Sequence, residues 1–224
     1  MIEPRILEVR TRILKKNDEL ARAMRQRFVD AGVFVSNMVS SPGTGKTAFL
    51  EATLRHLVEQ GVPVAAIVGD LETDNDARRL ARSGAEVRQI ETHGCCHLEA
   101  DMIESQLGDW KLDELEFLFI ENVGNLVCPT SWDLGESLRI ALLSVTEGED
   151  KPLKYPGLFN TSDVAIITKM DLAEACEFDR QLAIENIRSV RPGMPVLEVS
   201  SKTGEGMEPW LEFLAARKQL LEVS

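Results

Sequence analysis

Residues 40–47, SSPGTGKT, combine glycines that free the backbone with a lysine and a hydroxyl side chain. The glycines let the chain turn tightly, so that backbone N–H groups point at phosphate oxygens. The Lys46 ammonium group would reach the β- and γ-phosphates, and the Thr47 hydroxyl would bind Mg²⁺. The pattern Gly-x-x-x-x-Gly-Lys-Thr is met except where Ser40 replaces the first glycine. A chance glycine-rich turn is disfavoured, because a strand pattern precedes this run and a helix pattern follows it.

Two later runs suit recognition of a guanine base. The run TKMD at 168–171 resembles the Asn-Lys-x-Asp motif of GTPases, with Thr168 in place of asparagine. Asp171 can accept two hydrogen bonds from guanine N–H groups that adenine lacks, and such an acceptor rejects the wrong base strongly. The stem of Lys169 would lie over the base. The run SSKTG at 200–204 resembles an element that touches the guanine oxygen in the same proteins.

Two carboxylate clusters follow other apolar runs. In GDLETDND, we expect Asp70 to contact Mg²⁺ directly or through water, with Asp74 a lesser candidate. Asp76 fits a helix N-cap at least as well. In ENVG, Glu121 would orient the metal or its water, and Gly124 would let the backbone approach the γ-phosphate.

The run GCCHLEAD places two cysteines directly before a histidine, in a chain with four cysteines and three histidines. Thiolate and imidazole are soft metal ligands. No Cys-x-x-Cys pair completes a closed site nearby, so a metal site, a catalytic cysteine and buried core thiols all stay open from spacing alone.

Composition limits the remaining classes. The chain has 224 residues, 44% hydrophobic and 28% charged, with a net charge of −12, which suits one globular domain. An acidic surface repels phosphate backbones, so a main role in nucleic-acid binding is disfavoured. No run has the length of a membrane span, and the charged N-terminus lacks the apolar centre of a signal peptide. We therefore expect no membrane contact, a cytoplasmic location and reduced thiols.

Short apolar runs alternate with helical patterns along the chain. Strands are predicted at 32–40, 62–70, 85–90, 115–122, 138–146, 163–171 and 194–201, and helices at 5–28, 47–61, 74–84, 96–107, 178–190 and 206–223. This alternation predicts an α/β fold, a single P-loop NTPase domain whose mostly parallel sheet is covered by helices on both faces. Residues 1–30 would form an N-terminal amphipathic helix packed on a domain of residues 31–224. Its apolar positions are Ile6, Val9, Ile13, Leu20, Met24 and Phe28.

With these motifs in view, the chain resembles the HypB family, the nickel-incorporation GTPases of hydrogenase maturation. The resemblance rests on SSPGTGKT, GDLETDNDA, CCHLEA, ENVGNLVCP, SVTEGEDKPLKYP and TKMDL, in this order from about residue 34 to the end. The most specific of them is ENVGNLVCP. The family belongs to the SIMIBI branch of P-loop GTPases, whose members dimerise across the bound nucleotide.

The resemblance implies a set of nucleotide and Mg²⁺ contacts. GTP or GDP would be held by Gly43, Thr44, Gly45, Lys46, Thr47, Ala48, Gly124, Lys169, Asp171, Ser201 and Lys202. The implied catalytic residues are Lys46, Asp70 and Glu121, and the implied Mg²⁺ contacts are Thr47, Asp70 and Glu121.

The resemblance also implies that Cys96, His97 and Cys128 bind Ni²⁺ or Zn²⁺ at the dimer interface. Two thiolates and an imidazole suit a four-coordinate metal with one position left for water or a partner ligand. The chain lacks the histidine-rich stretch and the Cys-x-x-Cys site of some family members. Cys95 is an addition, and it is a bystander, an auxiliary ligand or half of a vicinal disulfide. Cys176 is interpreted as structural.

The implied function is that of a slow GTPase whose nucleotide-dependent homodimer delivers nickel to a [NiFe]-hydrogenase large-subunit precursor, with a small zinc-containing nickel chaperone as partner. Lys154 would add positive charge across the dimer, unless it is simply an exposed lysine. The alternatives are a urease-type nickel chaperone, a metal-storage protein with a regulatory nucleotide site, and a metabolic P-loop kinase or ATPase with structural cysteines.

Overall fold

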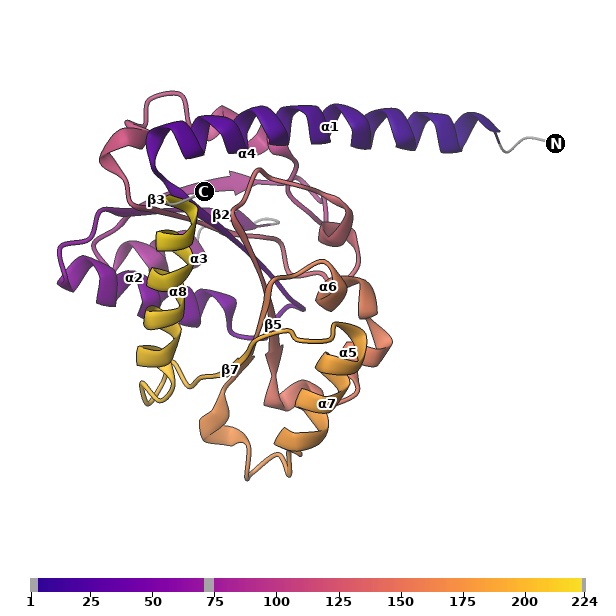
Figure 1. Cartoon of the computed structure of the whole chain (residues 1–224), viewed down its shortest axis with the longest axis vertical. Helices are drawn as coiled ribbons and strands as arrows, with labels where there is room; N and C mark the ends of the chain where they lie inside the picture. Colours follow the sequence, from indigo (N-terminus) through magenta and orange to yellow (C-terminus); the bar gives the residue numbers. More distant parts are fainter. Residues whose placement is uncertain (1–3, 71–74, 223–224) are drawn as a thin grey trace.

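The computed structural model describes residues 4–70 and 75–222, which contain one parallel seven-stranded sheet of order β3-β2-β4-β1-β5-β6-β7 (Figure 1). The strands are β1 (Phe34–Val39), β2 (Val64–Asp70), β3 (Glu86–Glu91), β4 (Phe117–Glu121), β5 (Leu138–Ser144), β6 (Val164–Thr168) and β7 (Val196–Glu198). Each neighbouring pair is parallel. The expected α/β fold is confirmed, and its carboxyl strand ends meet at one edge, where ligands of such sheets bind.

Helices cover both faces of the sheet. They are α1 (Pro4–Ala31), α2 (Lys46–Glu59), α3 (Asn75–Ala81), α4 (Ala100–Gln106), α5 (Lys151–Lys154), α6 (Pro156–Asn160), α7 (Arg180–Val190) and α8 (Met207–Glu222). Phe34 and Met38 of β1 join one apolar cluster with α2 and α8, whereas Val35 joins another with α1 and α4. Because successive strand residues point to opposite faces, the unbroken apolar runs follow from burial on both sides.

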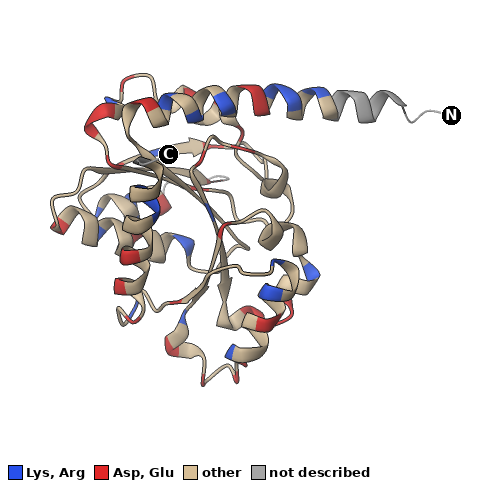
Figure 2. Cartoon of the chain, in the orientation of Figure 1, with Lys and Arg blue, Asp and Glu red and all other residues tan. Residues whose placement is uncertain are grey.

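Helix α1 packs on the sheet through its C-terminal half only. Ala21, Met24 and Phe28 are buried in the cluster with α4, whereas Ile13 is 48% exposed. Figure 1 shows the N-terminal half extending past the rest of the molecule, and basic and acidic positions follow one another along the coloured part of α1 in Figure 2. Ile13 is therefore more exposed in the single chain than the apolar residues of the C-terminal half. Among the described helices, none has the length and apolar character to cross a membrane.

The segment of the two adjacent cysteines differs from its prediction. A helix was expected over 96–107, but α4 begins at Ala100, so Cys96 and His97 lie in the irregular chain before it. The cause is tertiary, because the N–H of Leu98 donates to Asn122 Oδ1 at 3.1 Å and that of Ala100 donates to Asn17 Oδ1 at 2.8 Å. Side chains thus take the hydrogen bonds that a helix would have made.

Candidate nucleotide pocket and metal-binding cluster

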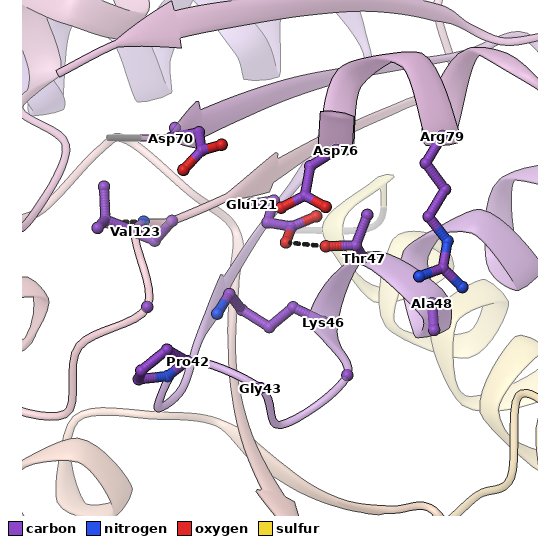
Figure 3. Close-up of a pocket in the computed structure, with 14 residues that line it drawn as sticks. Pro42, Gly43, Lys46, Thr47, Ala48, Asp70, Asp76, Arg79, Glu121 and Val123 are labelled. Atoms are coloured by element: carbon purple, nitrogen blue, oxygen red, sulfur yellow. Dashed lines mark hydrogen bonds between the residues drawn. The ribbon is translucent and has the colours of Figure 1, made fainter. Parts of the chain in front are cut away.

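The glycine-rich loop of residues 40–47 connects the end of β1 to the start of α2, as a phosphate loop requires. Gly43 and Gly45 adopt left-handed φ values of 77° and 99°, which other residues adopt at a cost. The loop borders a cavity of about 400 Å³ (Figure 3). The loop, the ends of β2 and β4, and α3 line it with Pro42, Gly43, Gly45, Lys46, Thr47, Ala48, Gly69, Asp70, Asp76, Arg79, Glu121, Asn122, Val123 and Gly124.

Lys46 is buried at the base of this cavity. Its Nζ donates to Ser40 Oγ at 3.1 Å, so the serine that departs from the phosphate-loop pattern supplies an acceptor for the lysine. Burial lowers the pKa of Lys46, and the negative charge of Glu121 opposes that shift most strongly. A bound phosphate would place further negative charge against this ammonium group.

Glu121 is buried beside the loop and fits a divalent ion. Its Oε1 accepts a hydrogen bond of 2.7 Å from Thr47 Oγ1, whereas its buried Oε2 has no hydrogen-bond partner. Burial raises the pKa of Glu121 to about 7, against the opposing charge of Lys46. A carboxylate and a hydroxyl side by side are hard oxygen ligands that suit Mg²⁺.

Asp70 lines the same cavity, as expected, but Asp76 and Arg79 were missed. Asp76 stands in the first turn of α3 and lines the cavity. Its charge acts on both Lys46 and Glu121 more strongly than that of Asp70 does. Figure 3 shows its carboxylate directed toward Glu121 and Thr47. Asp74 lies outside the described residues.

A second cavity of about 220 Å³ adjoins the loop and holds the expected base-recognition residues. It is lined by Gly45, Ala48, Thr168, Lys169, Asp171, Leu172, Ser201 and Lys202. Asp171 accepts a 2.6 Å hydrogen bond from Ser200 Oγ, and this bond holds the pKa of Asp171 below its usual value. The carboxylate is therefore ionised and can accept two base N–H groups.

Thr168 and Lys169 fasten this cavity to the phosphate loop. The buried Thr168 hydroxyl donates to the Thr44 carbonyl at 2.7 Å, and Lys169 Nζ donates to the Gly43 carbonyl at 2.6 Å. Thr168 thus contacts the loop backbone where GTPases usually carry asparagine. The base and phosphate parts of the pocket are held as one unit.

Glu147 also holds the phosphate loop, a role that was not predicted for it from the motif SVTEGEDKPLKYP. Its carboxylate accepts hydrogen bonds from the Ser41 hydroxyl, from Thr44 Oγ1 at 2.9 Å and from the Ser144 N–H at 2.9 Å. It follows β5, within the run SVTEGED. Three donors on one carboxylate fix the first half of the loop relative to the sheet.

Gly124 approaches the phosphate loop closely. A Cβ added at this position would lie 2.9 Å from Pro42 Cα and 3.0 Å from Pro42 N. Both are backbone atoms and cannot move aside as a side-chain end would. The expected role of Gly124 in close backbone approach therefore has a structural basis.

Cys96, His97 and Cys128 come together beyond the cavity, with one donor atom of each within 4.8 Å of the others. Cys96 Sγ lies 3.7 Å from His97 Nδ1. Bond lengths of about 2.3 Å to sulfur and 2.05 Å to nitrogen at a tetrahedral angle put the two donors about 3.6 Å apart. A hydrogen bond to the Cys128 thiol, and burial, raise the pKa of Cys96. The donor set fits one tetrahedral Zn²⁺ or Ni²⁺ ion, which would favour the thiolates.

Two further side chains position these ligands. The Asn125 side chain accepts hydrogen bonds from the N–H groups of Val127 at 2.7 Å and Cys128 at 2.9 Å. The indole of Trp132 stacks on the His97 ring, with centroids 4.3 Å apart and planes at 23°. Sequence reasoning missed Trp132, whose only signal was an aromatic residue four positions after Cys128. These contacts orient the ligands in the way that supporting residues do at metal sites.

Cys176 and Lys154 lie on the surface of the protein. Cys176 is exposed and belongs to neither metal-competent cluster among the described residues, so it is not a core thiol. Lys154 is exposed and pairs with Asp150 at 2.5 Å, which raises the pKa of Lys154. Its action across a dimer stays a prediction.

Comparison with known proteins agrees with this geometry. Residues 34–198 match the family model of the CobW/HypB/UreG nucleotide-binding domain, so the chain is a P-loop nucleotide-binding protein of that class. A hydrogenase maturation factor HypB from Rhizobium leguminosarum is 46% identical over 98% of this chain and 74% of its own length. The chain belongs to the HypB family of hydrogenase maturation factors.

Solved structures of the family have the same fold. HypB from Helicobacter pylori, crystallised in complex with nickel, is 42% identical with a TM-score of 0.85, covering 91% of this chain and 95% of that one. HypB from Archaeoglobus fulgidus is 35% identical with a TM-score of 0.84, covering 91% and 99%. The resemblance stated from the motifs is therefore confirmed.

Proposed function

We propose that the protein is a slow GTPase that couples its nucleotide state to nickel delivery during [NiFe]-hydrogenase maturation. The observation that carries this proposal is the short segment between Glu121 and Cys128. Its first residues line the phosphate cavity and its last is a metal-competent thiol. The nickel complex of the Helicobacter pylori relative supports the choice of metal.

Different residues of the pocket would bind the base, the phosphates and the Mg²⁺ ion of GTP. Asp171 selects guanine, Lys46 and the loop N–H groups hold the phosphates, and Thr47 and Glu121 hold Mg²⁺ with Asp70 or Asp76 nearby. Mg²⁺ held by these residues would supply positive charge against the charge that develops on the phosphates. We expect slow intrinsic turnover, as in switch GTPases that act without an assisting partner.

Two connections join the pocket to the metal cluster. The first is the chain itself, from Gly124 against the phosphate loop to Cys128 four residues on. The second is Asn122, which lines the cavity and accepts the N–H of Leu98, directly after His97. A shift of β4's end on γ-phosphate binding would move ligands on both sides of the cluster. Such a linkage works in both directions, so bound metal changes nucleotide affinity by the same factor.

An incomplete ligand set supports a nucleotide-dependent homodimer. The cluster offers three donors to an ion that takes four, and Val127 beside it is 61% exposed and apolar. A second copy would cover Val127 and supply or displace the fourth ligand. Opening of the dimer after hydrolysis would free nickel for the hydrogenase precursor, with a small zinc-containing nickel chaperone as a partner.

The test is titration of Ni²⁺ and Zn²⁺ into the full chain with GDP and with a non-hydrolysable GTP analogue, with the mass followed by sedimentation. We expect the two nucleotides to give metal affinities at least about fivefold apart, and the analogue to favour the dimer. Equal metal affinities with both nucleotides would remove the coupling. A preference for ATP over GTP would refute the assignment of Asp171.

A further inference from the structure

His97 also belongs to a second group of donors. Cys95, His97 and Glu99 each offer one ligand atom within 4.8 Å of the others. Cys95 Sγ lies 3.9 Å from His97 Nδ1, and Glu99 Oε1 lies 3.3 Å from His97 Nε2. Donors at about 2.05 Å from a tetrahedral ion lie about 3.3 Å apart. The separation of the Glu99 carboxylate from His97 Nε2 is that of two ligands of one ion bound through this nitrogen. The Cys95 thiol, which lies nearest the other ring nitrogen, completes the set within the 4.8 Å limit.

His97 Nε2 and the Glu99 side chain lack the hydrogen bonds that a purely structural role would give them. His97 Nε2 is buried and makes no hydrogen bond, because its approach to Glu99 lacks hydrogen-bond geometry. Glu99 stands at the N-cap position of α4, yet its side chain makes no capping hydrogen bond. A buried polar atom without a partner carries a cost that a bound ion would remove.

The backbone holds Cys95 in place. Its N–H donates to the Thr92 carbonyl at 3.0 Å, and the Thr92 hydroxyl donates back to the Cys95 carbonyl at 2.8 Å. In the irregular chain between this turn and α4, Cys95 and Cys96 both place a sulfur within 4 Å of His97 Nδ1. The position of Cys95 is therefore a fixed one rather than that of a loose surface thiol.

We propose that Cys95, His97 and Glu99 form a second donor set for a thiophilic divalent cation, Ni²⁺ or Zn²⁺, which shares His97 with the set of Cys96 and Cys128. A neutral imidazole offers one lone pair to a metal, so the chain holds one ion in either of two positions. This inference rests on the proposed function, and it supplies a step by which a bound ion changes ligands before transfer.

The two donor sets are expected to differ in metal affinity, and transfer of an ion requires a weaker position to which it can move. The first offers two thiolates and a nitrogen, whereas the second replaces one thiolate by a carboxylate, a harder ligand for these ions. Glu99 also lines a cavity of about 180 Å³ with Ile13, Asn17 and Leu20 of α1. The second position is thus the weaker one, and it lies toward α1.

The experiment uses the full chain and measures Zn²⁺ affinity by competition with a chromophoric chelator. The background variant carries Cys96→Ser and Cys128→Ser and keeps only the second donor set. To this background Cys95→Ser, Glu99→Gln and, as matched control, the exposed Cys176→Ser are added singly. Circular dichroism and thermal unfolding report whether each variant folds.

We expect the background variant to bind one Zn²⁺ per chain more weakly than the unaltered chain. Adding Cys95→Ser or Glu99→Gln lowers the affinity at least about tenfold further, and Cys176→Ser leaves it unchanged. The unaltered chain binds one ion per chain, because His97 is shared.

Three outcomes separate the possibilities. A folded background variant that binds no Zn²⁺, or one indifferent to Cys95→Ser and Glu99→Gln, overturns the second set but leaves the proposed function intact. Two ions per unaltered chain overturn the sharing of His97. No metal bound by the unaltered chain overturns the metal part of the proposed function itself. If the serine background does not fold, Cys96→Ala with Cys128→Ala takes its place.

Discussion

The side-chain oxygen of Asn122 accepts a hydrogen bond of 3.1 Å from the backbone N–H of Leu98. Asn122 follows Glu121 at the phosphate cavity, and Leu98 follows His97 in the metal cluster. Leu98 also lies against Gly69, where an added Cβ would lie 2.7 Å from its side chain. The ends of β2 and β4 therefore both contact the segment that carries His97.

This bond gives the first prediction. Asn122→Ala leaves the Leu98 N–H buried without its acceptor, so we expect a stability loss of about 1 to 3 kcal/mol. The ratio of metal affinities with the GTP analogue and with GDP should fall toward one. The control is Asn186→Ala, which removes a side-chain amide that donates to a backbone carbonyl, that of Glu149, far from both sites in sequence. An unchanged affinity ratio in Asn122→Ala would show that coupling runs elsewhere.

Glu121 predicts a pH dependence of stability in the chain free of nucleotide and Mg²⁺. Burial raises its pKa from 4.5 to about 7, so between these values the folded chain holds a proton that the unfolded chain has lost. Stability from this group is present below about 4.5 and falls as pH rises through 7. Glu121→Gln cannot ionise at this position. We expect its free energy of unfolding, relative to that of the unaltered chain, to be about 2 to 3 kcal/mol greater at pH 8 than at pH 5.

Urea unfolding at both pH values measures this difference. The exposed Glu104 offers a matched control. Glu104→Gln makes the same chemical change at a solvent-exposed position, so it should not alter the pH dependence of the free energy of unfolding. A gap between Glu121→Gln and the unaltered chain that is the same at pH 5 and pH 8 would contradict the assigned burial cost.

Gly124 predicts a steric effect on nucleotide binding. In Gly124→Ala the new methyl group would meet the Pro42 backbone at 2.9 to 3.0 Å, so the phosphate loop or the segment after β4 must shift. We expect GDP affinity to fall about tenfold or more, since small misplacements of binding groups carry large penalties. Gly108→Ala is the control, because nothing lies within 4 Å of its added Cβ. Isothermal titration with GDP distinguishes the two, and equal affinities would remove the close approach as a requirement.

Asp171 predicts base selectivity. Asp171→Ala removes the acceptor for two guanine N–H groups, so we expect GDP affinity to fall at least about 100-fold while weak ADP binding stays unchanged. The exposed Asp113 lies in another part of the chain, and Asp113→Ala should leave both affinities as they were. Competitive displacement of a fluorescent guanine nucleotide gives both values. A parallel loss of GDP and ADP binding would indicate a folding defect instead of lost selectivity.

Local patterns predicted the parts of the site that are continuous in sequence. The phosphate loop, the TKMD run and the ENVG run each follow a buried strand, and parallel strands bring such ends to one edge. Glu147, Asp76 and Trp132 were missed because their roles arise from contacts between distant segments. The helix expected at Cys96 failed for the same reason, because Asn17 and Asn122 bind its N–H groups from 83 and 24 residues away.

Trp132 gives a prediction about ligand orientation. Its indole stacks on the His97 ring at 4.3 Å, and such aromatic pairs contribute about 0.5 to 1.5 kcal/mol beyond the area they bury. In Trp132→Ala the imidazole would lose this support, so we expect Zn²⁺ affinity to fall about 10-fold, the lower end of the range for residues that support metal ligands. Trp132→Phe keeps an aromatic face and should recover most of that loss. Because neither variant removes a donor, the Zn²⁺ stoichiometry should stay the same in both. Equal affinities of the alanine and phenylalanine variants would mean that the ring plane is set by the donors alone.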